Sequence, residues 1–254
     1  MNKQYQDIVD NLTIMIIGPY DEQSLSNVEN YKKICKNVLV FMWSDIQTEK
    51  VQKYLLQDNE NVTVYTEKSP DRSALENAMF QHYETLLPQV KGIMLTTEKC
   101  QTKYALRTRS DESFSDLSPM IEKFSKNLDS VVSSNIVWRT KWTRRKKHMG
   151  DHTFITDTET LYKVYKDYYD SAFWGLRGTS LRKEFYNGEH HGTCEEHLYN
   201  FFMKHGRHPV PINVEKLGDY TVCVRGTKYT NREGLDPLIS VVPDLLIGEE
   251  QSEK

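Results

Sequence analysis

The sequence predicts an α/β fold in which a mostly parallel central sheet is flanked by helices. A near-continuous apolar run, LTIMIIG at residues 12–18, is typical of a strand that is buried on both faces. Two more strand-like runs follow, NVLVFMWSD at 37–45 and NVTVYTE at 61–67. Amphipathic stretches at 24–36 and 48–57 separate the three runs. This alternation is the pattern of right-handed βαβ units, which build parallel sheets.

The rest of the chain continues the alternation less regularly. We predict helices at 73–87, 90–100, 118–130 and 195–206, and strands at 103–111, 134–140 and 153–156. A further helix covers the stretch TDTETLYKVYKDYY, with Thr156 or Asp157 as its N-cap and acids in its first turn.

Length and charge exclude several classes of protein. A chain of 254 residues is long enough for one large α/β domain, which we prefer over two small ones. A net charge of −3 with 27% charged residues favours neither a general nucleic-acid binder nor an acidic tail protein. Nucleic acid is therefore not an expected partner, and any site for an anion must be local.

Cysteine spacing and hydropathy bear on the compartment. The four cysteines, at 35, 100, 194 and 223, show no CxxC spacing, which argues against a zinc ribbon and against a disulfide framework. The first residues are polar, and no run reaches the roughly 18 apolar residues of a membrane span. We expect neither a signal peptide nor a transmembrane segment, and a cytoplasmic protein with peripheral membrane contact left open.

Charged residues gather where the strand YALRTRSDE, at 104–112, leaves the core. Alternation along a strand places Arg107, Arg109 and Asp111 on one face. Ligands of parallel sheets bind at the carboxyl ends of the strands, where an acid can hold a divalent cation and arginines can neutralise a diphosphate. The alternative is an Arg–Asp pair that only fixes the register of the strand.

Two later stretches offer further acids. Asp151 and His152 stand beside a short apolar strand and could form a metal-ligand or an acid/base pair, although an acid before a strand is often a turn residue. The segment GEHHGTCEEHLY places Glu195 and Glu196 at the start of a helix, where compensation of the helix dipole explains one of them.

Four stretches, in this order, resemble the WavE-type lipopolysaccharide synthesis family over residues 12–205. LTIMIIGP is similar to the opening strand of that family, and YALRTRSDE to its central K-x-R-S-D strand. MGDHTFITDTETL is similar to its S-D-x-x-F-x-G-x-x-x-x-L element, and CEEHLYNFF to its P-E-x-x-L helix. This chain departs from the family at Ile17, where the family has glutamine, and at Cys194, where it has proline.

The resemblance implies a metal-dependent glycosyltransferase with a GT-A-like fold, which moves a sugar from a nucleoside-diphosphate sugar donor to a glycan acceptor. It implies a single domain over residues 1–254, with a nucleotide-sugar-binding half at 12–112 and an acceptor and catalytic half at 113–245. Asp111 would be the ligand of a divalent metal, Mn²⁺ or Mg²⁺, and Arg107 and Arg109 would position the donor or stabilise the departing diphosphate.

The resemblance also assigns the remaining roles. Gly18 and Pro19 would shape the turn that receives the base and ribose of the donor, and Asp45 could contact the base. An inverting transfer needs a carboxylate to take the proton of the acceptor hydroxyl, and the candidates are Asp151, Glu195 and Glu196.

The basic run WRTKWTRRKKH, at 138–148, carries six Lys and Arg residues and two tryptophans. It is either a solvated loop or a binding segment for an anionic glycan, an anionic membrane or nucleic acid. Within the glycosyltransferase interpretation, Arg144, Arg145 and Lys146 are expected to bind the acceptor. The rival interpretation of the chain is a non-catalytic module that binds a polyanion or nucleic acid through this run.

Glycines at 175, 178, 188 and 192 punctuate a polar stretch at 175–193. Such a stretch is either an ordinary exposed loop or a lid that closes over an activated sugar and excludes water.

Overall fold

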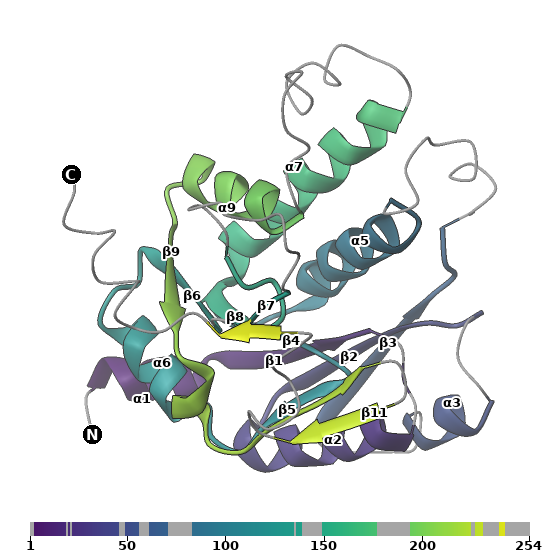
Figure 1. Ribbon diagram of the computed structural model, residues 1–254, viewed down its shortest axis with the longest axis horizontal. Helices are drawn as coiled ribbons and strands as arrows, with labels where there is room; N and C mark the ends of the chain where they lie inside the picture. The colour runs from purple at the N-terminus through teal and green to yellow at the C-terminus, as the bar shows by residue number, and fades with distance from the viewer. Residues whose placement is uncertain are drawn as a thin grey trace.

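A computed structural model gives the structure of the protein. It describes residues 3–18, 20, 22–45, 49–55, 61–70, 83–134, 136–138, 149–176, 194–224, 227–230 and 239–241. These residues form three layers, with one central sheet between two groups of helices (Figure 1).

In the described residues the central sheet has seven strands, in the order β3-β2-β1-β4-β8-β6-β9. Their bounds are β1 Leu12–Ile17, β2 Val38–Trp43, β3 Val62–Glu67, β4 Tyr104–Arg109, β6 Ser130–Ser134, β8 Phe154–Asp157 and β9 His208–Ile212. Only β8 runs antiparallel to its neighbours, β4 and β6, and all other pairs are parallel. The mostly parallel α/β sheet that the sequence predicts is confirmed.

Helices cover both faces of this sheet, and each face has its own hydrophobic core. The helices α1 (Lys3–Asp10), α2 (Glu22–Ile34), α3 (Glu49–Leu55) and α6 (Ser118–Ser125) supply one core. The helices α5 (Tyr83–Lys99), α7 (Thr158–Leu176) and α9 (Cys194–Lys204) supply the other. Figure 1 shows the two groups on opposite sides of the strands.

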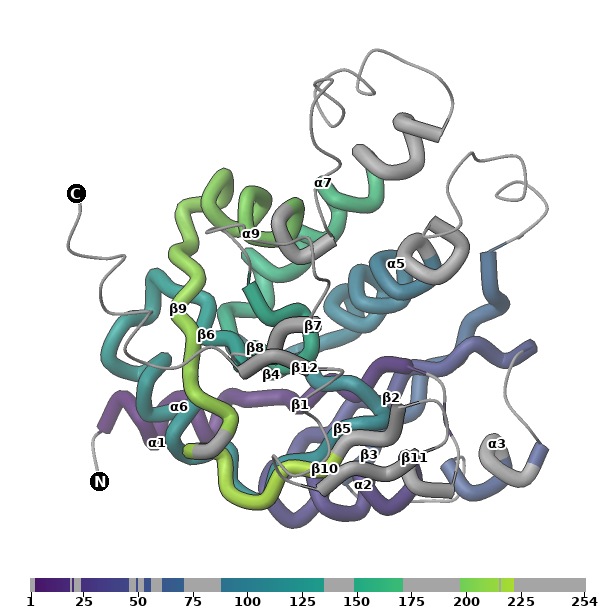
Figure 2. The backbone as a smooth tube through the Cα atoms, in the orientation of Figure 1, coloured from purple at the N-terminus to yellow at the C-terminus, as the bar shows by residue number. Residues whose placement is uncertain are grey.

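The first strand shows why an apolar run predicts burial on both faces. All six residues of β1 are buried. Ile14 and Ile16 pack into one core, whereas Met15 and Ile17 pack into the other. In Figure 2 the purple β1 lies beside the teal β4, which follows it by about a third of the chain, and their register pairs Ile17 with Arg109.

Smaller strands continue from the central sheet. The strand β5 (Glu112–Phe114) begins directly after the turn at Ser110 and Asp111 and pairs with β10 (Tyr220–Val224), which pairs with β11 (Thr227–Thr230). A short 3-10 helix, η1 (Val214–Leu217), precedes β10, and β7 (Ile136–Trp138) pairs with β12 (Ile239–Val241). The predicted division into two halves at residues 112 and 113 falls inside β5, and it stays a prediction.

The predicted helix at 118–130 is too long, because α6 ends at Ser125. A turn follows, in which the side chain of Asn127 accepts a hydrogen bond from the backbone N–H of Asp129 at 3.2 Å. The strand predicted at 134–140 is present as β7, at Ile136–Trp138, whereas the central-sheet strand β6, at Ser130–Ser134, was not predicted. The polar sequence of β6, SVVSS, gave no signal for a buried strand, although all of its residues are buried.

Other differences concern elements that local signals did not mark. Residues 83–99 form one continuous helix with Pro88 inside it, where we predict two helices, and residues 71–82 lie outside the described part. The strand β9, HPVPI, was not predicted because it carries two prolines. It lies at the edge of the sheet, where a residue without an N–H is tolerated.

The helix α7 begins as predicted, and the structure selects its cap. The backbone N–H of Thr160 donates to Oδ1 of Asp157 at 2.8 Å, which is the bond of an N-cap residue. Thr156 is buried within β8 instead.

No helix among the described residues is both long and apolar enough to cross a membrane. Cys35 and Cys100 are free thiols.

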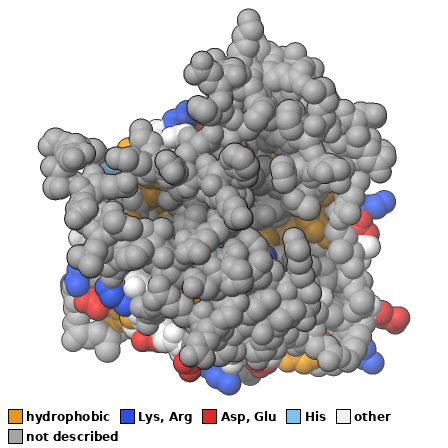
Figure 3. Space-filling model, viewed as in Figure 1, with side chains coloured by type: hydrophobic (Ala, Val, Ile, Leu, Met, Phe, Trp, Pro, Cys, Tyr) orange, Lys and Arg blue, Asp and Glu red, His pale blue; other side chains and the backbone are white. Residues whose placement is uncertain are grey.

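Acidic and basic side chains lie interspersed around the margin of the face in Figure 3.

Candidate functional site

The ends of β1 and β4 meet at the carboxyl edge of the sheet, where Gly18 lies against Ser110. The backbone N–H of Ser110 donates to the carbonyl of Ile17 at 3.3 Å. Gly18 has a φ of +151°, and a Cβ at this position would lie 2.5 Å from Oγ of Ser110. Both the backbone conformation and the close approach therefore require glycine.

Arg109 and Asp111 form a two-pronged ion pair at this edge. Nε of Arg109 donates to Oδ1 of Asp111 at 2.8 Å, and Nη2 donates to Oδ2 at 2.6 Å. The side chains are 27% and 16% exposed, so the pair lies at the surface of the cluster. Burial raises the pKa of Asp111, but the hydrogen bond and the charge of Arg109 outweigh it and lower this pKa. The Arg–Asp pair that the register alternative requires is therefore present.

Arg107 binds the backbone of the loop that carries Asp151. Its side chain is 1% exposed, and Nη1 donates to the backbone carbonyls of Asp151 and His152, the latter at 2.7 Å. The guanidinium also lies over the ring of Phe154, 5.9 Å from its centroid. Arg107 thus ties β4 to the segment before β8. Its predicted contact with a donor stays a prediction.

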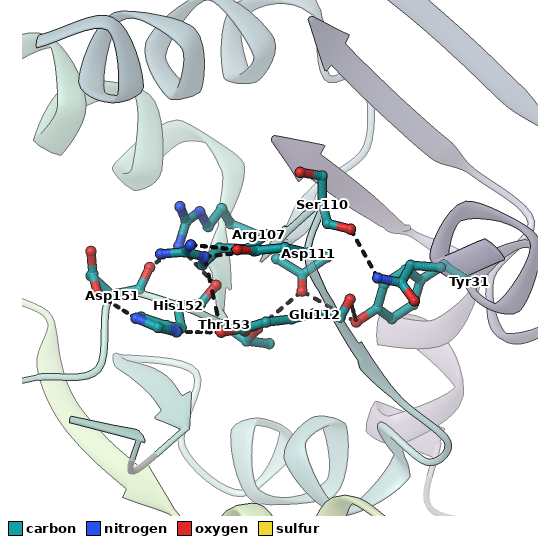
Figure 4. A network of polar contacts seen from close by, with 11 residues as sticks. Tyr31, Arg107, Ser110, Asp111, Glu112, Asp151, His152 and Thr153 are labelled. Atoms are coloured by element: carbon teal, nitrogen blue, oxygen red, sulfur yellow. Dashed lines mark hydrogen bonds and ion pairs between the residues drawn. The ribbon is translucent and has the colours of Figure 1, made fainter. Parts of the chain in front are cut away.

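The ring of His152 lies between Asp151 and Glu112, and the three side chains form a row near Asp111 (Figure 4). Nδ1 of His152 is hydrogen-bonded to Oε1 of Glu112, and Nε2 lies 3.7 Å from Oδ1 of Asp151. Burial raises the pKa of Asp151, yet His152, whose ring acts here only when it is protonated, and the guanidinium groups of Arg107 and Arg109 lower it overall. Asp151 is thus an ionised carboxylate at neutral pH, with a side chain that is 19% exposed.

A buried hydrogen-bond network holds Glu112, at the inner end of this row. Thr153 donates to Oε2 of Glu112 at 3.3 Å, and its hydroxyl lies 3.0 Å from that of Thr108. Tyr31, from α2, reaches the hydroxyl of Thr108 at 3.2 Å and donates to the carbonyl of Glu112 at 3.3 Å. The network therefore links a helix on one face of the sheet to the cluster at its edge.

The described residues do not fit a divalent metal site as they stand. No group of three His, Cys, Asp or Glu side chains among them is arranged to hold a metal ion. Both oxygens of Asp111 accept hydrogen bonds from Arg109, so a metal would have to displace that guanidinium. The metal that the resemblance implies stays a prediction.

The other predicted site residues are placed only in part. Asp45 follows β2, and its Oδ1 accepts a hydrogen bond from the backbone N–H of Ser69 at 2.8 Å, so its carboxylate joins the loops after β2 and β3. Glu195 and Glu196 lie in the first turn of α9, but their side chains are outside the description. Outside the described residues lie Pro19, Arg144, Arg145, Lys146 and residues 177–193, which make up most of the predicted lid.

Sequence reasoning missed Glu112 and Tyr31. Glu112 directly follows Asp111 in the chain, yet its side chain points into the protein and is 0% exposed. Only the start of β5 at this residue reverses its direction relative to Asp111. Tyr31 is one of several apolar residues at helical spacing, and nothing local marks its hydroxyl as part of a network.

A cavity of about 710 Å³ lies at the opposite, amino-terminal edge of β4. Its lining includes Lys103, Asp157 and Arg207, together with Thr102 and Tyr162. Of the predicted site residues that the structure describes, none lines this cavity, so it is separate from the described site.

Comparison with known proteins gives little guidance. No family model and no curated protein matches the chain. Among solved structures, a putative glucose-1-phosphate thymidylyltransferase from Bacillus anthracis, in complex with a sucrose, is similar at 10% identity and a TM-score of 0.45, over 84% of this chain and 89% of that one. HddC from Yersinia pseudotuberculosis is similar at 9% identity and a TM-score of 0.40, over 60% of this chain and 79% of that one. Scores below 0.5 identify neither a fold family nor an activity.

Proposed function

We propose that the protein is a glycosyltransferase that moves a sugar from a nucleoside-diphosphate donor to a glycan acceptor. One observation carries this proposal: Arg109, Asp111 and Asp151 gather where β1 and β4 end. Ligands of open parallel sheets bind at this edge. The cluster combines a guanidinium for phosphate oxygens with an ionised carboxylate for a proton, which are the two groups that the transfer requires.

Arg109 would bind the donor diphosphate. A guanidinium has five N–H groups, and Arg109 gives two of them to Asp111. As far as the described residues show, the other N–H groups of Arg109 are available to phosphate oxygens. Asp111 fixes the plane of the guanidinium, so that its direction is set before the donor arrives. As the bond between the anomeric carbon and the diphosphate breaks, the positive charge stabilises the leaving group.

Asp151 would act as the base of an inverting transfer. Its carboxylate takes the proton of the acceptor hydroxyl, the hydroxyl oxygen forms the new bond to the anomeric carbon, and the diphosphate leaves with the electron pair. The lowered pKa of Asp151 keeps it deprotonated for this step. Its partial exposure, 19%, lets an acceptor reach it.

The remaining predicted residues complete the proposal at the margins of the site. Gly18 and Asp45 lie at the ends of β1 and β2, and we propose that they contact the nucleoside of the donor, as the resemblance implies. Glu195 and Glu196 stay alternative bases, and Arg144, Arg145 and Lys146 stay proposed acceptor contacts. Mn²⁺ or Mg²⁺ stays a prediction of the resemblance, and no step above depends on it.

Calorimetry with UDP, GDP, dTDP and ADP tests the donor site directly. We expect one of them to bind, and Arg109→Gln to weaken that binding about tenfold or more, because the variant loses the guanidinium proposed to contact the phosphate oxygens. Lys103→Gln is the matched control: this lysine lies at the opposite edge, is 63% exposed, and should leave binding unchanged. Titrations with and without Mn²⁺ measure metal dependence separately.

Two outcomes would contradict the proposal. If none of the diphosphates binds, with or without Mn²⁺, the non-catalytic module becomes the better interpretation. Asp111→Asn separates the same alternatives, because it keeps the size of the side chain but removes its charge. A folded variant with weakened binding supports the donor site, whereas a variant that unfolds shows that the ion pair is structural.

A further inference from the structure

A buried acid stands behind the candidate base. Glu112 is 0% exposed and His152 is 1% exposed, yet the two side chains are hydrogen-bonded to each other. Burying such a pair is costly, and apolar residues of the same volume are often at least as stable. Stability alone therefore gives no reason for a Glu–His pair at this position.

The pair fixes the direction of the imidazole ring. Since Nδ1 faces a carboxylate, it carries the hydrogen of that bond. Nε2 is then the nitrogen that can accept a proton, and it points to Oδ1 of Asp151 at 3.7 Å. Figure 4 shows the ring of His152 between Asp151 on one side and Glu112 on the other.

The surroundings hold both partners in place. Arg107 donates to the backbone carbonyls of Asp151 and His152, which fixes the loop. Thr153 holds Oε2 of Glu112 at 3.3 Å, and Nε of Arg109 lies 4.0 Å from Oε1. The carboxylate of Glu112 is thus held in place, and so is the backbone that carries Asp151 and His152.

We propose that His152, held by the buried Glu112, is a positioning residue that takes from Asp151 the proton of the acceptor hydroxyl. This inference rests on the proposed function and adds a second step to it. The proton first passes from the acceptor oxygen to Oδ1 of Asp151, and then from Oδ1 to Nε2 of His152. The result is an imidazolium between two carboxylates, with Asp151 ionised again. Once the products leave, the imidazolium returns the proton through Oδ1 of Asp151 to water, because the side chain of Asp151 is 19% exposed whereas the ring is buried. The neutral ring is then ready for the next turnover. The separation of 3.7 Å is longer than a hydrogen bond, so the two atoms must approach during the transfer.

Hydrolysis of UDP-glucose, GDP-mannose and dTDP-glucose measures this step without a known acceptor, since water then supplies the proton. His152→Asn is the informative variant, because its amide can still donate to Glu112 but offers no base at the position of Nε2. We expect kcat to fall about 10- to 100-fold, with the donor KM unchanged. Glu112→Gln should act in the same direction, because it removes the charge that stabilises the imidazolium.

Tyr31→Phe is the structural control. It removes a hydroxyl from the same buried network, at 3.2 Å from Thr108, without touching His152. Its kcat should stay within twofold of the wild-type value even if its melting temperature falls as far as that of Glu112→Gln. Equal loss of kcat in all three variants would show that the pair acts only through stability, and it would overturn the inference.

A spectroscopic measurement tests the geometry without turnover. In a ¹⁵N spectrum of the histidine rings, the signal that disappears in His152→Asn should show the hydrogen on Nδ1. A hydrogen on Nε2 alone would overturn the inference. Wild-type protein that hydrolyses no donor would contradict the proposed function and this step together, whereas hydrolysis at full kcat in His152→Asn would contradict this step alone.

Discussion

Asp111 and Glu112 are neighbours in the chain, but they belong to two different ion pairs. Asp111 pairs with Arg109 at the surface of the site, where both side chains keep some exposure. Glu112 pairs with His152 in the interior, where neither does. The turn at Ser110 and Asp111 separates β4 from β5 and sends the two carboxylates in opposite directions.

This difference shows how one short segment can serve two purposes. A partly exposed pair has hydrogen-bonding capacity left and can exchange partners with a ligand, because water can replace a lost contact. A buried pair cannot exchange partners, since each unpaired charge would stay desolvated. This contrast supports our proposals of ligand contact for the outer pair and of positioning for the inner pair.

Removing the inner carboxylate is expected to have the largest effect on stability. Glu112→Ala leaves His152 and Thr153 without their buried acceptor, which should lower the free energy of unfolding by about 3–5 kcal/mol. Asp111→Ala should lower it by only about 1–2 kcal/mol, because water reaches the remaining Arg109. Urea unfolding of both variants measures the contrast, and equal losses would remove the distinction between the pairs.

The turn between the pairs depends on Gly18. Gly18→Ala should cost about 1–3 kcal/mol, because its φ of +151° disfavours a side chain and the new Cβ would meet Oγ of Ser110 at 2.5 Å. The double variant with Ser110→Ala should recover part of the loss, since it removes the contact but not the backbone strain. Thermal unfolding of the single and double variants measures this recovery, and full recovery would mean that φ costs nothing.

Acid should weaken the outer pair in a defined range. The folded-state pKa of Asp111 is lowered below its unfolded value, about 3.9, so its contribution to stability is present above that pH. The contribution is lost as the pH falls through the folded-state pKa. The free energy of unfolding of the wild type should therefore exceed that of Asp111→Asn by about 1–2 kcal/mol at pH 7 and by less at pH 3. An equal difference at both values would show that charge plays no part in the pair.

A third carboxylate extends the comparison to the surface. Asp45 is exposed and accepts a hydrogen bond from the backbone N–H of Ser69. Asp45→Asn should change the free energy of unfolding by no more than about 0.5 kcal/mol, as expected for most surface substitutions. If Asp45 contacts the nucleobase of the donor, Asp45→Asn should weaken diphosphate binding in the calorimetric assay more than it lowers the free energy of unfolding. An unchanged affinity would exclude Asp45 from the donor site.

Local sequence patterns predicted the elements that carry strong periodicity. The strands β1 and β2 lie where the apolar runs place them, because strands buried on both faces need continuous apolar sequence. The strands β3 and β4 lie within the strand-like runs predicted at 61–67 and 103–111. Arg107 and Arg109 share a face of β4 because alternation is a property of the strand itself. The strands β6 and β9 were not predicted, since serine and proline carry no such signal and pairing with neighbours stabilises both strands.

The sequence by itself determined the α/β class and the presence of charged residues at the end of β4. Only the tertiary structure decided what each charge does. It placed Arg107 under the loop of Asp151, gave Arg109 to Asp111, and joined Glu112 to a histidine 40 residues later in the chain. Local patterns record which face of an element is buried, but the partner of a buried charge depends on which segments the fold brings together.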